Sequence, residues 1–382
     1  MKIVVNTRLL ITNQLNGIGW FTYHTLKRLV KWHPEHQFVF LFDRKYDENF
    51  IFGPNVIPEI IFPPARHPLL WYIWFEHAIV NKVKKHNPTL FFSPDGYLSL
   101  KIKDIPCLPV IHDINFHHNK KGVPYFDGIF WRYYFPKYAQ IASRIITVSE
   151  FSKNDIAAYY NIPHNMIDVA YNGANEIFKP ISHGEKENVK KKYTKGQDYF
   201  LFVGDLLPRK NISRMIQAFN RFKKSPGSPI KLLIVGDKLF FTSEMKRVYD
   251  TSEYREDIIF TGRLDQDQLK MVMGAALSLI LVSCFEGFGI PIVEAMYTDI
   301  PVITSNISSM PEVAEDAALM VDPYSIDSIK EAMLKMSSDE KLREELVVNG
   351  RSQRLKFSWD NTAKATWRSI EKVAGSAKEN DI

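Results

Sequence analysis

The segment LSLILVSCFEGFGIPIVE, residues 277–294, combines a buried strand, a glycine loop and the start of a helix. Its apolar first part predicts a strand, and Pro291 suits the first turn of a helix. Glu286 is then expected on the loop at the strand's carboxyl end, where α/β sheets bind ligands, with Glu294 one turn into the helix. Two carboxylates around a glycine loop indicate a site for sugar hydroxyls beside an anionic group such as a pyrophosphate. The spacing alone also fits a plain strand–turn–helix in which Glu294 only complements the helix dipole.

Length and composition indicate a soluble protein of two domains. The 382 residues exceed one ordinary core, and 45% hydrophobic with 24% charged residues is typical of globular chains. No apolar run reaches the roughly 20 residues of a membrane span, and residues 1–5 read as a strand rather than a signal peptide. Cys107 and Cys284 offer neither a disulfide framework nor zinc spacing. A cytoplasmic location is expected.

The net positive charge lies in the first half of the chain. Residues 1–180 contain 20 Lys and Arg against 14 Asp and Glu, whereas residues 181–382 contain 29 of each kind. Such a surplus fits an anionic acceptor or an anionic membrane surface, and it also fits ordinary solvation. No dense Lys/Arg stripe appears, so a nucleic-acid partner is not expected.

Apolar strands alternate with helical segments along the whole chain, which predicts two parallel, doubly wound sheets. We expect an N-terminal domain over 1–180, a C-terminal domain over 181–357, and a final segment over 358–382. The lysine-rich residues 181–197 are the candidate linker. Apolar positions at three- and four-residue spacing predict a helix over Trp359–Val373 that packs on the protein body, followed by a polar tail, Gly375–Ile382. The expected strands are Ile3–Asn6, Phe38–Phe42, Thr89–Ser93, Leu108–His112, Arg144–Val148, Met166–Tyr171, Tyr199–Val203, Lys231–Val235, Ile258–Thr261, Leu277–Val282, Pro301–Thr304 and Ala318–Val321.

Several further motifs follow expected strands. Gly17 and Gly19 form a loop that suits a phosphate at a helix start, or a plain tight turn. His112 closes an apolar strand and should emerge at the carboxyl edge of its sheet. Arg209 and Lys210 lie in the stretch GDLLPRKN of residues 204–211. The planar guanidinium of the arginine and the compact ammonium of the lysine both suit a diphosphate. The basic pair also fits a solvated turn before a helix capped by Asn211.

The triplet Asp265-Gln266-Asp267 has the spacing of a metal-binding D-x-D motif. It directly precedes a helical segment, so helix N-cap and first-turn charges explain both aspartates better. No metal site is expected here.

In order and spacing, these motifs resemble the family 4 glycosyltransferases, whose GT-B fold has two facing Rossmann-like domains with a deep cleft between them. The likeness is greatest to the bacterial O-antigen and capsule mannosyltransferases, and it covers nearly the whole chain. The motifs that carry it are Asn16–Gly19, His112-Asp113, Thr147–Ser152, Asn172-Gly173, Gly204–Asn211, Gly262–Leu264, Glu286–Glu294 and Phe357–Trp359.

The resemblance implies a retaining transfer of a hexose from a nucleoside diphosphate sugar, with GDP-mannose favoured, no cofactor and no metal. The acceptor implied is a saccharide or a lipid-linked saccharide. Many relatives carry a basic residue directly after the first glycine of the Gly204 motif, where this chain has Asp205. The residues implied to act in catalysis are His112, Glu286, Arg209 and Lys210, and those implied to bind the donor are Gly17, Gly19, Gly204, Arg263, Gly287, Phe288, Gly289, Ile290 and Glu294.

Aromatic residues are dense in Trp71–Phe75 and Tyr125–Tyr138. Most such rings form core, but the second run exceeds what one buried stripe requires. An exposed part would hold a sugar acceptor or touch a membrane interface from the cytoplasmic side. His117 and His118 are expected at the surface or on the acceptor side.

Two other functions fit the same fold. A nucleotide-sugar epimerase would release free nucleotide and an isomerised sugar. A catalytically silent partner subunit would bind nucleotide or another transferase without donor hydrolysis, although both glutamates, His112 and the Arg209–Lys210 pair argue against such decay.

Overall fold

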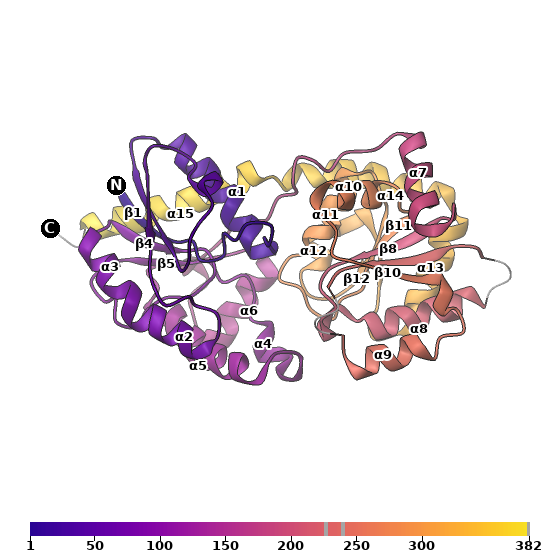
Figure 1. Ribbon diagram of the computed structural model, residues 1–382, viewed down its shortest axis with the longest axis horizontal. Coiled ribbons are helices and arrows are strands. Elements are labelled where there is room, and N and C mark those ends of the chain that lie inside the picture. Colours follow the sequence, from indigo (N-terminus) through magenta and orange to yellow (C-terminus); the bar gives the residue numbers. More distant parts are fainter. Residues whose placement is uncertain (225–227, 238–240, 380–382) are drawn as a thin grey trace. The chain divides into compact units, whose positions relative to one another are not determined.

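The alternating strands and helices assemble into two parallel sheets in the computed structural model, which describes residues 1–224, 228–237 and 241–379 (Figure 1). The chain divides into two units. Unit 1 comprises Met1–Gly173 and Ser358–Ile382, and unit 2 comprises Ala174–Phe357.

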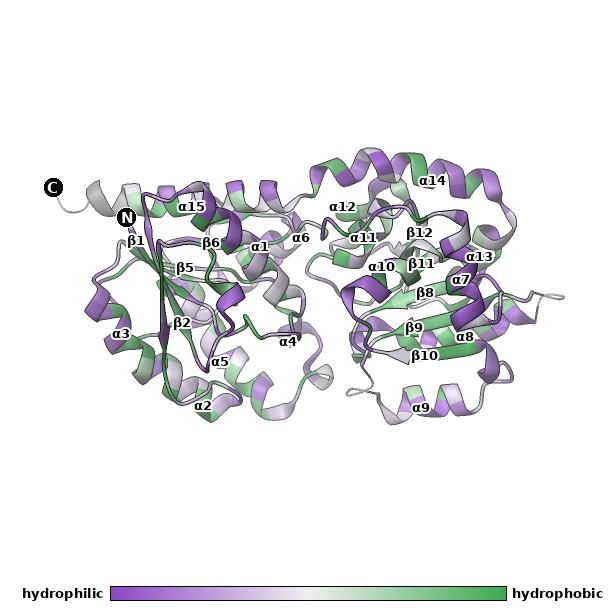
Figure 2. Ribbon diagram, turned by 45° about the horizontal axis from the view of Figure 1, so that its top comes forward, coloured by the Kyte–Doolittle hydropathy of each residue, from purple (hydrophilic) through white to green (hydrophobic). Residues whose placement is uncertain are grey.

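Unit 2 contains a six-stranded parallel sheet in the order β10-β9-β8-β11-β12-β13. Its strands colour as apolar runs in Figure 2, which is why the sequence pattern predicts them well. The strand order reverses between β8 and β11, and such a switch point is where doubly wound sheets bind ligands. The strands are β8 (Tyr199–Val203), β9 (Lys231–Val235), β10 (Ile258–Gly262), β11 (Ser278–Leu281), β12 (Val302–Ser305) and β13 (Ala318–Val321).

Helices cover both faces of this sheet, as the doubly wound prediction requires (Figure 1). One face carries α8 (Ile212–Lys223), α9 (Ser243–Asp250) and α13 (Ile326–Ser338). The other carries α10 (Gln266–Gly274), α11 (Ile290–Tyr297), α12 (Met310–Ala314) and α14 (Glu340–Gln353).

Unit 1 contains a five-stranded parallel sheet in the order β3-β2-β1-β4-β5. A parallel bridge between Val110 and Ile146 joins it to the pair β6-β7. Helices α1 (Gly17–Trp32) and α15 (Trp359–Glu379) lie together on one face, and α2 (Pro68–Ile73), α3 (Ile79–His86) and α5 (Tyr125–Ile141) on the other (Figure 1). The strands are β1 (Lys2–Asn6), β2 (Gln37–Phe42), β3 (Val56–Ile60), β4 (Leu90–Ser93), β5 (Cys107–Pro109), β6 (Ile145–Thr147) and β7 (Ile167–Val169).

Strand β3 is missing from the sequence prediction. Its sequence VIPEI contains Pro58 and Glu59, which break an apolar run. Because β3 lies at the sheet edge and pairs only with β2 in the described residues, a proline there removes no necessary ladder bond.

The lysine-rich segment expected as a linker is instead helix α7 (His183–Thr194) of unit 2, so that expectation is wrong. Ser182 and Glu185 form a reciprocal capping box at its start, and Val189 and Thr194 are buried. A polar helix of this kind is stabilised by its cap and by one buried stripe, which composition alone does not reveal.

Helix α15 packs on unit 1 through the apolar face expected from its spacing, and Trp359, Ala363, Trp367 and Ile370 are all buried. The helical prediction is confirmed, although the helix continues to Glu379, into the expected polar tail. Residues 380–382 lie outside the described residues. The Trp359 ring stacks on His24 at 4.8 Å.

The aromatic runs are largely core, as expected. Trp74, Phe75 and Tyr138 have no exposed surface, and Phe135 is 6% exposed.

Across the ranges that the structure describes, no helix combines the length and apolar character needed to cross a membrane.

Gly173 lies directly against the first residue of α15, and a Cβ there would come within 2.3 Å of the Trp359 backbone nitrogen. We predict that Gly173→Ala lowers the free energy of unfolding by about 1–3 kcal/mol, the usual cost of overpacking. Thermal and denaturant melts measure this change. The control is Gly184→Ala in α7, where nothing lies within 4 Å of the added Cβ. Equal stability of the two variants would contradict the packing account.

Candidate active site

Glu286 lies on the loop after β11 and is the centre of a buried charge cluster in unit 2. Only 5% of the residue is exposed. Its Oε1 accepts hydrogen bonds from Lys210 Nζ at 2.5 Å and Ser283 Oγ at 2.6 Å, and its Oε2 accepts one from Arg209 Nη1 at 2.6 Å. The structure therefore brings together three of the four residues expected to act in catalysis.

Arg209 and Lys210 are positioned by a short 3₁₀ turn after β8 that is fastened to the end of β11. The Arg209 carbonyl accepts from the Cys284 N–H at 2.7 Å. Asn211 adopts a left-handed conformation (φ 63°), and its Nδ2 donates to the carbonyls of Val282 at 3.0 Å and Pro323 at 2.7 Å. The alternative in which the Asn211 side chain caps α8 is wrong, because that side chain connects loops instead.

Two serines after β12 hold the Glu286 loop from its other side. Ser308 Oγ accepts from the Glu286 N–H at 3.0 Å and lies 2.5 Å from the Glu286 carbonyl. Ser309 Oγ lies 2.9 Å from the Glu286 carbonyl oxygen and 3.0 Å from the Phe288 carbonyl oxygen. Sequence reasoning missed these serines, because only the neighbouring positions of β11 and β12 in the sheet bring them to Glu286.

The charges in this cluster shift one another's pKa values. Burial alone would raise the pKa of Glu286, but Arg209 and Lys210 outweigh it and hold that pKa at about 2. Burial lowers the pKa of Lys210, against the opposing attraction of Glu286. The ionised Glu286 carboxylate is thus paired with both the Arg209 and the Lys210 side chains.

Glycines allow the backbone to approach closely at the edge where β8, β9 and β10 end. Gly204 has φ 147°, and a Cβ on the neighbouring Gly236 would lie 1.9 Å from the Gly204 carbonyl oxygen. Gly262 ends β10 with φ 74°, and Arg263 directly after it is exposed. These donor-binding candidates thus lie at the carboxyl edge that the motif pattern predicts.

Helix α11 begins as expected, with Pro291 in its first turn and Gly289 in a left-handed N-cap conformation (φ 102°). The loop residues Gly287–Gly289 and the first helical residue, Ile290, follow Glu286 directly. The Phe288 ring is buried against Phe357, with the ring centroids 5.5 Å apart.

Glu294 is half-buried in α11, and no hydrogen bond or ion pair of its carboxylate is present in the part of the chain that the structure describes. Burial raises its pKa to about 8. The two glutamates of the motif therefore have opposite environments.

Asp265 is the N-cap of α10, where its side chain accepts from the Gln268 N–H at 2.7 Å in a capping box. Asp267 lies in the first turn and pairs with Lys270 at 3.2 Å. The helix-start interpretation of the D-x-D triplet is confirmed.

His112 lies beyond β5, which ends at Pro109 and is shorter than expected. Its Nε2–H donates to the Pro94 carbonyl at 2.8 Å, its ring packs edge-on against Phe21, and burial lowers its pKa. The half-buried imidazole is therefore neutral at physiological pH and held at the carboxyl edge of the unit 1 sheet.

Gly17 is the first residue of α1 and is exposed, whereas Gly19 is buried. The Gly19 N–H already donates to Asn16 Oδ1 at 2.9 Å. The Gly19 N–H is therefore occupied, whereas Gly17 lies at the exposed end of the turn.

His117 is buried, so the expectation that places it at the surface is wrong. Its Nε2 lies 2.9 Å from the Tyr160 hydroxyl, and burial lowers its pKa to about 4. The packing of α6 (Glu150–Tyr160) covers it, and no local pattern around His117 signals that packing. His118 is exposed, as expected, and pairs with Asp155 at 2.9 Å.

Family models match both halves of the chain. The model described as Glycosyltransferase Family 4 matches residues 15–176, and that described as Glycosyl transferases group 1 matches residues 185–353. The chain belongs to the family 4 glycosyltransferases. This glycosyltransferase therefore carries its Glu286 cluster in the group 1 region and His112 in the family 4 region.

Named relatives and solved structures agree with this assignment. O-antigen chain mannosyltransferase B of Escherichia coli is 28% identical over 290 residues, 74% of each chain. O-antigen chain mannosyltransferase RfbU of Salmonella typhimurium is 28% identical over 71% of each chain. HepE of Anabaena, solved in complex with UDP and glucose, has a TM-score of 0.76 at 16% identity, covering 97% of this chain and 99% of that one. Such structural neighbours show that the glycosyltransferase has the GT-B fold.

The raised pKa of Glu294 makes the stability of this glycosyltransferase depend on pH. Between its ordinary value of 4.5 and about 8, the folded protein binds more protons at Glu294 than the unfolded chain. The free energy of unfolding should therefore fall as pH rises through this range, by at most about 1.4 kcal/mol per pH unit. We predict a flatter pH profile of the melting temperature in Glu294→Gln. Parallel profiles for the wild type and Glu294→Gln would refute the assignment, and Glu340→Gln, an exposed helix-start variant, should leave the profile unchanged.

Proposed function

We propose that this glycosyltransferase transfers mannose from GDP-mannose to a hydroxyl of a saccharide or lipid-linked saccharide, in the synthesis of a surface polysaccharide. The Glu286 cluster carries the proposal, because it joins a buried carboxylate and two cations at the switch point of the unit 2 sheet. The choice of mannose rests on the mannosyltransferase names of the relatives.

Arg209 and Lys210 are proposed to bind the diphosphate together with the amides of Gly287–Ile290. A guanidinium, an ammonium and a helix start are all complementary to phosphate charge. As the bond from the sugar to the diphosphate breaks, negative charge grows on the leaving group, and fixed cations stabilise that charge most. Because these groups supply the charge, no metal is required in the proposal.

Glu286 is proposed to hold a hydroxyl of the transferred sugar. A carboxylate offers about four acceptor positions. Lys210, Ser283 and Arg209 occupy three of them, which leaves one for a hydroxyl beside the diphosphate. This arrangement links the sugar to the same cations that stabilise the leaving group.

Glu294 is proposed to bind the ribose of the nucleotide. A half-buried carboxyl group without a cation partner suits a neutral diol better than a charged ligand. In unit 1, His112 is proposed to contact the hexose through its Nδ1, since its Nε2–H is already bonded to Pro94.

Transfer is proposed to retain the anomeric configuration and to give an α-linkage. Retaining hydrolases use a carboxylate nucleophile, but here the ionised carboxylate of the cluster is bound to two cations. In the proposed reaction the acceptor hydroxyl attacks from the face that the diphosphate leaves, and the leaving phosphate accepts the hydroxyl proton.

The proposed reaction predicts an α-mannoside product from GDP-mannose and a mannose-terminated acceptor. The one-bond coupling between C1 and H1 of the product, measured by NMR, gives the configuration, and the assay is repeated with EDTA. A β-linkage would indicate opposite-face attack with His112 as a candidate general base. Loss of activity in EDTA with rescue by manganese would contradict the metal-free proposal, and release of an isomerised free sugar would indicate the epimerase.

The acceptor side is proposed to approach an anionic membrane from the cytoplasm through an exposed stripe on α5. Tyr125 is 73% exposed, Phe126 72% and Tyr133 55%, and together with Ile129 they follow helical spacing along one face. Lys137 Nζ lies 3.4 Å from the Tyr133 ring centroid. Aromatic rings beside a cation suit an interface with anionic headgroups.

We predict that the protein co-sediments with vesicles containing phosphatidylglycerol and more weakly with neutral phosphatidylcholine vesicles. Phe126→Ser combined with Tyr133→Ser should weaken that binding several-fold, because two exposed rings no longer enter the interface. The matched control is Val348→Ser on α14 of unit 2, where the valine is 58% exposed. Unchanged sedimentation of the double variant would contradict the membrane contact and indicate that the exposed α5 residues bind the saccharide acceptor instead.

A further inference from the structure

The turn that joins α1 to β2 has the sequence His33-Pro34-Glu35-His36, and its backbone is held by several hydrogen bonds. The His36 N–H donates to the His33 carbonyl at 3.1 Å, and Pro34 restricts φ in between. Asn55 Nδ2 lies 3.0 Å from the His36 carbonyl and 3.2 Å from the carbonyls of both His33 and Val30. The turn is therefore fixed independently of its side chains.

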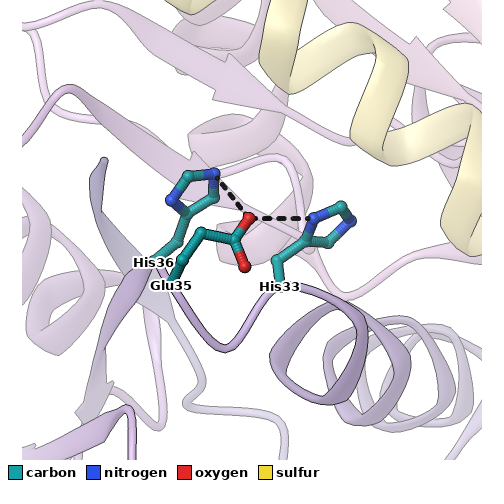
Figure 3. Close-up of side chains that lie close together, drawn as sticks. All are labelled: His33, Glu35 and His36. Carbon is teal, nitrogen blue, oxygen red and sulfur yellow. Dashed lines mark ion pairs between the residues drawn. The ribbon is translucent and has the colours of Figure 1, made fainter.

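The three polar side chains of the turn converge on one point (Figure 3). Glu35 Oε1 lies 3.6 Å from His33 Nδ1 and 3.4 Å from His36 Nε2. All three ligand atoms lie within 4.8 Å of one another, and no other three His, Cys, Asp or Glu side chains come this close in the described part of the chain. Tetrahedral Zn²⁺ with ligands at about 2.0–2.1 Å places neighbouring ligand atoms about 3.4 Å apart. The two separations from Glu35 Oε1 are close to that value.

Contacts outside the cluster orient both imidazole rings. The His33 ring stacks on Trp367 with centroids 3.5 Å apart and planes inclined by 14°. The His36 ring lies 5.3 Å from the same indole, and its Nδ1 lies 3.1 Å from the Met1 amino group. These contacts fix the positions of both rings beside Glu35.

We propose that His33, Glu35 and His36 bind a Zn²⁺ ion, with water as the fourth ligand. Two imidazoles and one carboxylate suit zinc, whereas Ca²⁺ and Mg²⁺ prefer oxygen ligands throughout. The Glu35 side chain is 59% exposed, so the ion can enter from solvent. Because the His33 ring stacks on α15, bound zinc strengthens the attachment of this helix to α1. The ion is structural and takes no part in the proposed transfer.

Calorimetric titration of the chelator-treated full-length protein with zinc sulfate tests the site. The expected result is one Zn²⁺ per chain with a micromolar or lower Kd. Glu35→Gln and His36→Ala should each weaken zinc affinity at least about tenfold, since the loss of even an outer-shell partner typically lowers metal affinity by that factor. Glu48→Gln and His164→Ala, both exposed in unit 1, are the matched controls. Absence of stoichiometric binding, or equal weakening in the controls, would overturn the proposal.

Trp367 offers a second readout in the same titration, because its indole lies against a proposed ligand. Zinc should change the tryptophan emission of the wild type, and this change should be absent in Glu35→Gln. It should also be absent in Trp367→Phe, which keeps an aromatic ring beside His33. An emission change that persists in Glu35→Gln would place the zinc elsewhere and overturn the site.

Discussion

The buried carboxylate of Glu286 depends on the cations beside it, and the arrangement of unit 2 depends on keeping these charges together. Glu286 is only 5% exposed, and an ionised group so buried is tolerated only with close partners of opposite charge. Removing one partner of a buried ion pair typically lowers the free energy of unfolding by about 3–5 kcal/mol. The partners come from loops after different strands, with Arg209 and Lys210 following β8, Ser283 following β11 and Ser308 following β12. The strand order β8-β11-β12 is therefore what assembles the site.

The two glutamates of the motif have opposite electrostatic environments, and this contrast underlies the proposal that each holds a different kind of ligand group. Glu286 has a pKa of about 2 beside two cations, and Glu294 a pKa of about 8 without one. Pairs of carboxyl groups with pKa values pushed apart commonly have distinct roles in active sites. Arg209 and Lys210 outnumber Glu286 in the cluster, and Asp205 also attracts Lys210.

The sequence predicts the parallel sheets well, because buried parallel strands read as apolar runs and glycine loops mark their carboxyl ends. It fails where the outcome depends on neighbours in space. Edge strand β3 contains Pro58, which argues against a strand by local pattern, and the segment over α7 is stabilised by a cap and one buried stripe. Asn211, Ser308 and the burial of His117 depend on which loops and helices lie beside them. The motifs identify Arg209 and Lys210 as site residues, but they do not predict that both side chains contact Glu286 directly.

The central claim is that Glu286 holds the reacting sugar and takes little part in binding the nucleotide. Steady-state turnover of Glu286→Gln, together with its GDP affinity by calorimetry, tests this claim most directly, with the exposed Glu244→Gln on α9 as the control. The account predicts a turnover loss of roughly 100-fold or more, the scale of one preorganised contact in the transition state, with GDP affinity changed only slightly. An equal loss of turnover and GDP affinity would contradict it.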